Sequence, residues 1–162
     1  MKRPTEQGLG LIEVLIATLV LSVGLLGATL VQSQAQAAAQ QADWQHQALR
    51  SAQDMAQAMR SNPLALEQGA YTAPEPDAAQ PVSAQACDTS PCDPVARAQH
   101  DVQQWRQRLA ERLPSGRGAL LAEGPTQRRL VVMWQSPTQN ESTACPAPWP
   151  SEFSCLSLGV WL

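Results

Sequence analysis

The stretch that decides the architecture is Leu9–Val31, LGLIEVLIATLVLSVGLLGATLV, which holds a single charged residue, Glu13. As a helix, these 23 residues have a length of about 34 Å, enough to cross a bilayer core of about 30 Å. Lys2 and Arg3 precede the stretch, and the next positive residue is Arg50. Because positive residues favour the cytoplasmic side, we expect a cytoplasmic N-terminus and a chain that lies outside the cytoplasm after residue 31.

Three simpler membrane signals compete for this stretch. A cleaved secretory signal has a shorter apolar core, of about 7–15 residues, followed by a small-residue cleavage site. A lipoprotein signal needs a cysteine just after the apolar run, and the first cysteine here is Cys87. A plain signal anchor fits the length and charge but leaves Glu13 unexplained, since a carboxylate inside a membrane span is costly and is by default functional or paired.

The residues around Glu13 favour a fourth signal. The string QGLGLIEVL, residues 7–15, ends a short basic leader at Gly8 and places Glu13 five residues later. It resembles the class III signal of type IV prepilins and the related pseudopilins. The resemblance implies cleavage by a membrane peptidase after Gly8, N-methylation of Leu9, and pairing of Glu13 with the terminal amine of a neighbouring subunit. Leu9 and Gly10 depart from the family's usual Phe and Thr or Ser, and a cut after Gly10 would break the spacing to Glu13.

Helical character continues beyond the apolar run. Residues 32–60 contain no proline or glycine and are rich in alanine and glutamine, which form helices well. Pro63 disfavours helical geometry at Asn62, so the pattern predicts one helix from near Leu11 to about Ser61. Apolar residues form one stripe along its second half: Trp44, Ala48, Leu49, Ala52, Met55, Ala56 and Met59.

A second helix is expected further along. Residues 62–94 are rich in Pro, Ala, Asp and Ser and predict a surface excursion that ends at Asp93-Pro94, an N-cap followed by proline in the first helical position. Pro114-Ser115-Gly116 ends the helix. Its apolar stripe comprises Val95, Ala98, Val102, Trp105, Leu109 and Leu113, and arginines flank it at Arg106, Arg108 and Arg112.

Three apolar runs near the C-terminus predict strands. They are Ala119–Ala122, Arg129–Gln135 and Leu156–Leu162, and Gly124-Pro125-Thr126 separates the first two as a hairpin loop would. The fold class is therefore α+β, with a long N-terminal helix, a small antiparallel sheet of about 3–4 strands, and an extra helix near residues 95–113. We expect a leader at residues 1–8, a membrane or filament-core helix at 9–31, and a periplasmic domain at 32–162.

The four cysteines are Cys87, Cys92, Cys145 and Cys155, and an even count in a domain outside the cytoplasm indicates two disulfides. Three pairings are possible, and we favour the two local ones, Cys87 with Cys92 and Cys145 with Cys155. A zinc site made from all four competes poorly, because the second pair is spaced more widely than zinc ligand pairs usually are.

Further blocks resemble the family of type IV pilus modification proteins, PilV. They are Ala56–Pro63 with Gly69-Ala70-Tyr71, Cys92 before the helix that holds Trp105, Leu113–Gly116, and Val131–Trp134. The resemblance covers most of the chain except residues 64–91 and 136–155. It implies a pilin-like fold and a minor pilin of a Gram-negative bacterium, one that primes pilus assembly with other minor pilins and the major pilin and supports a tip adhesin. The implied location is the inner membrane, with the N-terminus cytoplasmic, and then the pilus at the cell surface.

Other functions have weaker support. A type II secretion pseudopilin would carry the same N-terminal signal. A DNA-binding minor pilin would use Arg128-Arg129 and the arginines flanking the second helix, but a chain cut after Gly8 has nine arginines against thirteen acidic residues and no lysine. No catalytic, metal-binding or cofactor-binding motif is present, and His46 and His100 lie on different expected helices. We therefore expect no enzymatic activity and no cofactor, and the chain is instead a substrate of the prepilin peptidase.

Overall fold

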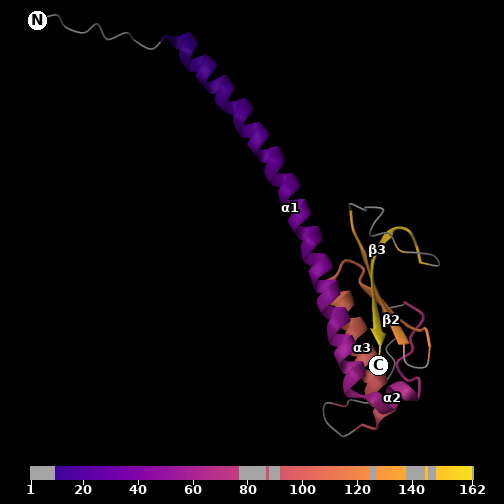
Figure 1. The fold of residues 1–162 in the computed structure, drawn as a ribbon. Helices are drawn as coiled ribbons and strands as arrows, with labels where there is room; N and C mark the ends of the chain where they lie inside the picture. The colour runs from indigo at the N-terminus through magenta and orange to yellow at the C-terminus, as the bar shows by residue number, and fades with distance from the viewer. Residues whose placement is uncertain are drawn as a thin grey trace, which may run out of the picture. The chain divides into compact units, whose positions relative to one another are not determined.

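The computed structural model describes residues 10–76, 87, 92–124, 127–137, 145 and 149–161. In chain order, the elements are α1 (Leu11–Ser61), α2 (Pro63–Glu67), α3 (Pro94–Arg112), β1 (Arg117–Ala122), β2 (Gln127–Gln135) and β3 (Phe153–Trp161) (Figure 1). The chain divides into two compact units, an N-terminal unit (Met1–Gln41) and a C-terminal unit (Ala42–Leu162). Helix α1 supplies residues to both.

The ends of α1 agree with the sequence prediction. The amides of Glu13 and Val14 donate to the carbonyl of Gly10, which opens the first turn. At the other end Asn62 has φ −133° and ψ 63°, outside helical geometry, as expected for a residue before proline. The predicted helix from Leu11 to Ser61 is therefore confirmed.

Helix α2 corrects the expected excursion after Asn62, because the chain starts a second, five-residue helix at once. Pro63 occupies its first turn, where the missing amide costs nothing. Gly69 ends the turn with φ +71°, a backbone conformation that glycine adopts without strain. Five residues are too few to show a helical period, which is why the sequence pattern did not reveal this helix.

Within the C-terminal unit, α1 buries a narrow stripe of small and flexible side chains. Four of the seven predicted positions, Ala48, Ala52, Met55 and Met59, are at most 1% exposed, and Ala56 is 3% exposed. Trp44 is partly buried against the same core. Leu49 was expected in the stripe but is 36% exposed, because it lies at the margin of the buried face.

Helix α3 is capped and packed as the sequence predicted. The Asp93 side chain accepts hydrogen bonds from the amides of Val95 and Ala96 at 2.9 and 3.0 Å. Trp105 is fully buried, and its indole N–H donates to the carbonyl of Ser51 in α1 at 3.0 Å. A Cβ atom at Gly118 would lie 2.5 Å from the Trp105 ring, so only glycine fits where β1 crosses this indole.

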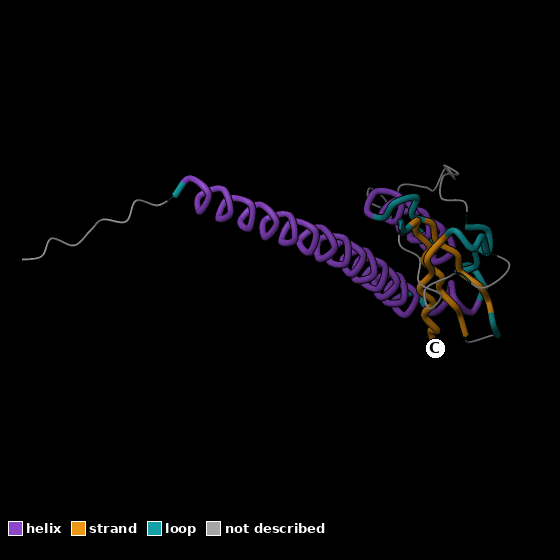
Figure 2. Tube along the Cα trace, turned by 90° about the horizontal axis from the view of Figure 1, so that it is seen from above, coloured by secondary structure: helices purple, strands orange, loops and turns teal. Residues whose placement is uncertain are grey.

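The three strands form one antiparallel sheet in the order β1-β2-β3. They make a layer against α3 and the C-terminal turns of α1 (Figure 2). Side chains alternate between the two faces: Leu130, Val132 and Trp134 join the core shared with the helices, whereas Val131 and Met133 pack on the opposite face with Phe153.

All three strands are longer at their N-terminal ends than the apolar runs predicted. Arg117 pairs with Met133, and Gln127 pairs with Trp161, so polar residues extend the ladder. β3 begins at Phe153 rather than at Leu156. Backbone pairing draws in such residues because it satisfies their amides and carbonyls whatever their side chains are. Residues 125–126 of the expected hairpin loop, and Leu162, lie outside the described residues.

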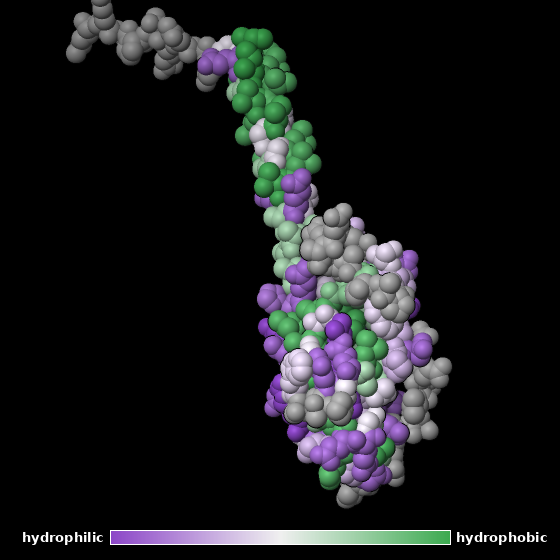
Figure 3. All heavy atoms as spheres, turned by 45° about the vertical axis from the view of Figure 1, so that its right-hand side comes forward, coloured by the Kyte–Doolittle hydropathy of each residue, from purple (hydrophilic) through white to green (hydrophobic). Residues whose placement is uncertain are grey.

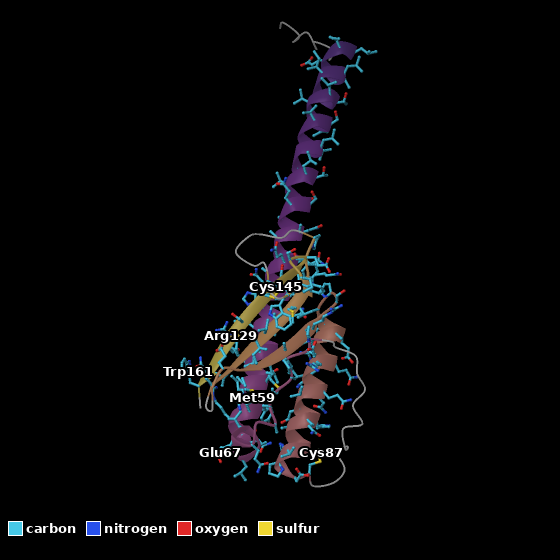
Figure 4. The ribbon with its side chains drawn as sticks, turned by 90° about the vertical axis from the view of Figure 1, so that its right-hand side faces the viewer. Met59, Glu67, Cys87, Arg129, Cys145 and Trp161 are labelled. Atoms are coloured by element: carbon cyan, nitrogen blue, oxygen red, sulfur yellow. A yellow bond between two sulfur atoms is a disulfide. The ribbon has the colours of Figure 1, made fainter. Side chains whose placement is uncertain are left out.

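Both disulfides that the sequence favoured are present. Cys87 is bonded to Cys92, and Cys145 is bonded to Cys155, which fastens Cys145 to β3. Because all four sulfur atoms are in disulfides, the four-cysteine zinc site is excluded. Figure 4 labels Cys87 and Cys145, which lie toward opposite ends of the C-terminal unit.

A buried tyrosine joins α1, the segment after α2, and α3. The Tyr71 hydroxyl donates to Asp101 at 2.8 Å, and the Asn62 amide donates to the Pro94 carbonyl at 2.8 Å. Tyr71 is fully buried, and burial together with the hydrogen bond to Asp101 raises its pKa far above the ordinary value. The hydroxyl therefore stays protonated and can keep donating to the carboxylate.

The outer edge of β1 is covered by the segment that follows Tyr71. Ala73 and Leu120 exchange two backbone hydrogen bonds, at 2.9 and 3.0 Å. The Arg106 guanidinium donates to the carbonyls of Gly118 and Ala73, at 3.0 and 3.1 Å, and to that of Glu75. These contacts fix the segment in place and leave little of the β1 edge open.

Candidate anchoring and assembly segment

The part of α1 from Leu11 to Val31 is apolar and exposed on all sides. Every residue from Gly10 to Gln40 is exposed. The green surface along this part of the helix in Figure 3 marks its apolar side chains. The large apolar residues here are each at least half exposed: Leu11, Ile12, Val14, Leu15, Ile16, Leu19, Val20, Leu21, Val23, Leu25, Leu26, Leu30 and Val31. Such a surface is stable only in lipid or against other apolar helices.

The hydroxyl groups on this surface are satisfied within the helix itself. Thr18, Ser22, Thr29 and Ser33 each donate to the carbonyl three residues earlier, at distances of 2.7–2.9 Å. A hydroxyl bonded in this way needs no water. These four polar residues therefore do not prevent the helix from lying in an apolar environment.

Glu13 is the one charged residue between Gly10 and Ala42. It lies in the first turn of α1, where the helix dipole stabilises negative charge. Among the described residues no cation forms an ion pair with it; the pair found there joins Arg129 to Glu123. A carboxylate in an apolar helix is stabilised when a positive group pairs with it. For Glu13 that group would have to come from outside the described residues.

The predicted processing residues, Gly8 and Leu9, lie outside the described residues. Within the described chain, α1 is a helix long and apolar enough to cross a membrane, and its apolar window lies near the N-terminus. This helix is compatible with a membrane anchor.

Two of the five arginines considered for DNA contact, Arg106 and Arg128, are held by the protein itself. Arg128 is 3% exposed and donates to the carbonyls of Gly124, Gln127 and Leu66. Arg106 is tied to the β1 edge as described above. Neither of these two guanidinium groups is presented for phosphate binding. Sequence reasoning missed this because charge alone does not show which arginines are buried.

The two histidines lie on different helices, His46 on α1 and His100 on α3. His100 neighbours Gln104 on α3, with 3.4 Å between the ring Nε2 and the amide nitrogen, whereas His46 is an exposed residue of α1. His46 lines a cavity of about 300 Å³ together with Gln45, Leu49, Trp134, Cys155 and Leu156. No sequence pattern indicated this cavity, because its lining comes from three elements far apart in the chain. Among the described residues no group of three or more His, Cys, Asp or Glu side chains could hold a metal ion.

No protein-family model, curated protein or solved structure matches this chain. The described residues establish an α+β, pilin-like arrangement: a long N-terminal helix with an exposed apolar half, followed by a small domain in which three antiparallel strands, two further helices and two disulfides are seen.

Proposed function

We propose that this chain is a minor pilin that takes part in priming, assembly or tip composition of a type IV pilus. In this proposal the prepilin peptidase removes residues 1–8 and methylates Leu9, while the chain sits in the inner membrane with its C-terminal domain in the periplasm. The subunit then leaves the membrane and joins other minor pilins and the major pilin in the filament, where it can support a tip adhesin.

The observation that carries the proposal is the N-terminal half of α1. It exposes apolar side chains on all sides, satisfies its own hydroxyls and holds one carboxylate in its first turn. A simple membrane anchor needs the apolar surface but gains nothing from Glu13, which costs energy in lipid. A filament core explains both features, because neighbouring helices replace the lipid and a neighbour's terminal amine can pair with the carboxylate.

Intact-mass spectrometry of the full chain, extracted from membranes of cells with and without the prepilin peptidase, tests the proposal. We expect a chain beginning at Leu9 and carrying one added methyl group in the first strain, and an uncut chain in the second. Gly8→Leu should block the cut, whereas Gly10→Ala is the matched control that should leave it unchanged. An uncut chain in both strains would assign a simple signal anchor, and a cut near residue 39 would assign a secreted domain; either result overturns the proposal.

Filament membership is a separate step and needs its own measurement. Sheared pili should contain the processed chain, and Glu13→Ala should reduce its amount in the pilus fraction at least severalfold while cleavage continues. If the processed chain is instead required for protein export and never appears in sheared pili, the chain is a pseudopilin of a type II secretion system.

A further inference from the structure

Two hydrogen bonds that point away from the β2–β3 ladder show which backbone groups of β3 face outward, toward the edge that no other described strand pairs with. The Gln135 amide donates to the carbonyl of Pro114, and the carbonyl of Phe153 accepts from the amide of Cys145. Gln135 and Phe153 are directly opposite each other in register. They therefore form a non-hydrogen-bonded pair, and the backbone groups of Phe153 point outward, away from β2.

The register of β2 with β3 runs without a bulge from one end to the other. Outward-pointing residues must then alternate along β3, which selects Cys155, Ser157, Gly159 and Trp161. Among the described residues none of these four has a backbone hydrogen bond on the outer side. β3 is the outermost strand of the sheet in Figure 4, with Trp161 labelled at its end.

The two edges of the sheet differ in how they are protected. The β1 edge is paired with Ala73 and fastened by Arg106. β3 contains no charged residue and no proline over its nine residues, and Trp161 is 71% exposed. Exposed edge strands normally carry such residues, because an unprotected edge accepts a further strand.

The cavity near His46 lies beside this same edge. Leu156 of β3 and Trp134 of β2 form its sheet side, and Gln45, His46 and Leu49 of α1 form its helix side. Its lining is mostly apolar. A strand added to β3 would direct every second side chain toward α1, so one of them would reach this cavity.

We propose that the outer edge of β3 is a strand-addition site for an extended, uncharged segment of a different protein chain, one that carries a large apolar side chain for the cavity. Backbone hydrogen bonds to Ser157, Gly159 and Trp161 supply the affinity, and the cavity selects the segment. A second copy of β3 does not fit this role. Its helix-facing residues Leu156, Leu158 and Val160 are already packed in its own core, so it has no side chain to offer.

The site uses no residue of the N-terminal unit. It therefore does not rest on the proposed pilus function, and a chain that only anchors in the membrane could still use it.

The test is selection of binding peptides from a phage-displayed library of random heptapeptides, using the full chain in detergent micelles as bait and empty micelles for subtraction. We expect enrichment of uncharged sequences with a large apolar residue at one fixed position. Binding of the enriched peptides should slow amide exchange at Ser157, Gly159 and Trp161, because the added strand covers these N–H groups.

Three variants and one control variant decide where the peptides bind. Ser157→Pro removes an outward N–H without breaking the β2–β3 ladder, and it should weaken binding about tenfold or more. Ser157→Lys should do the same, whereas Gln107→Lys, at another exposed position, on α3, is the matched control and should change nothing. Leu49→Glu should weaken binding by placing a charge in the cavity wall. Unchanged circular dichroism of each variant checks that it is folded.

Two outcomes would overturn the proposal. One is the absence of enriched peptides, or enriched peptides that bind the Ser157→Pro chain as tightly as the parent. The other is a dimer of the full chain, seen by light scattering, that Ser157→Pro dissociates, because the edge would then belong to a second copy of this chain.

Discussion

The two halves of α1 belong to one continuous helix but solve different physical problems. From Leu11 to Gln40 every residue is exposed, and large apolar side chains predominate as far as Val31. From Ala42 to Ser61 the helix buries one narrow stripe, mostly alanine and methionine, and turns polar residues to solvent. The first half has no partner for its apolar surface among the described residues, whereas the second half packs most of its apolar side chains into the core of its own domain. The two halves of α1 therefore have different roles although they form one helix.

The largest expected effect comes from placing the same charge in each half. Ala52→Asp puts an unpaired carboxylate at a fully buried position and should destabilise the C-terminal unit by about 4 kcal/mol or more, enough to unfold a marginal domain. Ala28→Asp, its matched control, should leave the domain folded but weaken membrane insertion by about 2.5–3.5 kcal/mol. Thermal unfolding by near-ultraviolet circular dichroism and retention in carbonate-washed membranes measure the two effects. Loss of the domain fold in Ala28→Asp would break the distinction between the halves.

A smaller effect is expected at the contact between α3 and the second half of α1. Trp105→Ala removes a buried indole that packs in the core and donates to Ser51, and it should cost about 3–5 kcal/mol of unfolding free energy. Trp161→Ala removes an exposed indole and should change stability by less than about 0.5 kcal/mol. Urea unfolding of the full chain in detergent compares the two. Equal losses would mean that the core does not centre on the α1–α3 contact.

The smallest effect concerns the buried tyrosine at the end of α1. Tyr71→Phe removes the hydrogen bond to Asp101 and should cost about 1 kcal/mol at neutral pH. In the parent chain the folded-state pKa of Tyr71 lies above its unfolded value of about 10. Its contribution to stability is therefore complete below pH 10 and declines as the pH rises beyond that value, because only the unfolded chain then loses the proton.

This pH dependence can be assigned to one residue. Tyr71 is the only tyrosine, the only lysine is Lys2, and the four cysteines are in disulfides. Melting temperatures measured from pH 8 to pH 11 should fall at the alkaline end in the parent chain but stay level in Tyr71→Phe. The absorbance of the phenolate, followed in the folded parent chain, gives the direct control. A tyrosine that ionises near pH 10 in the folded chain would contradict its buried, bonded position.

Much of the fold was predictable because local chemistry dictates it. Helix α1 continues past the apolar run because no helix breaker follows it, and it ends before Pro63. The start of α3 follows from Asp93 and Pro94. Helix α2 and the first residues of the strands were not predictable. A five-residue helix shows no period, and Arg117 and Gln127 join the sheet through backbone pairing rather than through their side chains.

By itself, the sequence determined the apolar helix with its lone carboxylate and the fold class, since helix and strand patterns depend on residues close together in the chain. It favoured the two local disulfides among three possible pairings, and the structure decided between them. Only the tertiary structure decided which arginines are buried, which edge of the sheet is open and where the cavity lies. Each of these features joins residues that are far apart in the chain. The cavity, for example, forms where α1, β2 and β3 meet, and the chain separation between Leu49, Trp134 and Leu156 leaves no local sequence pattern for it.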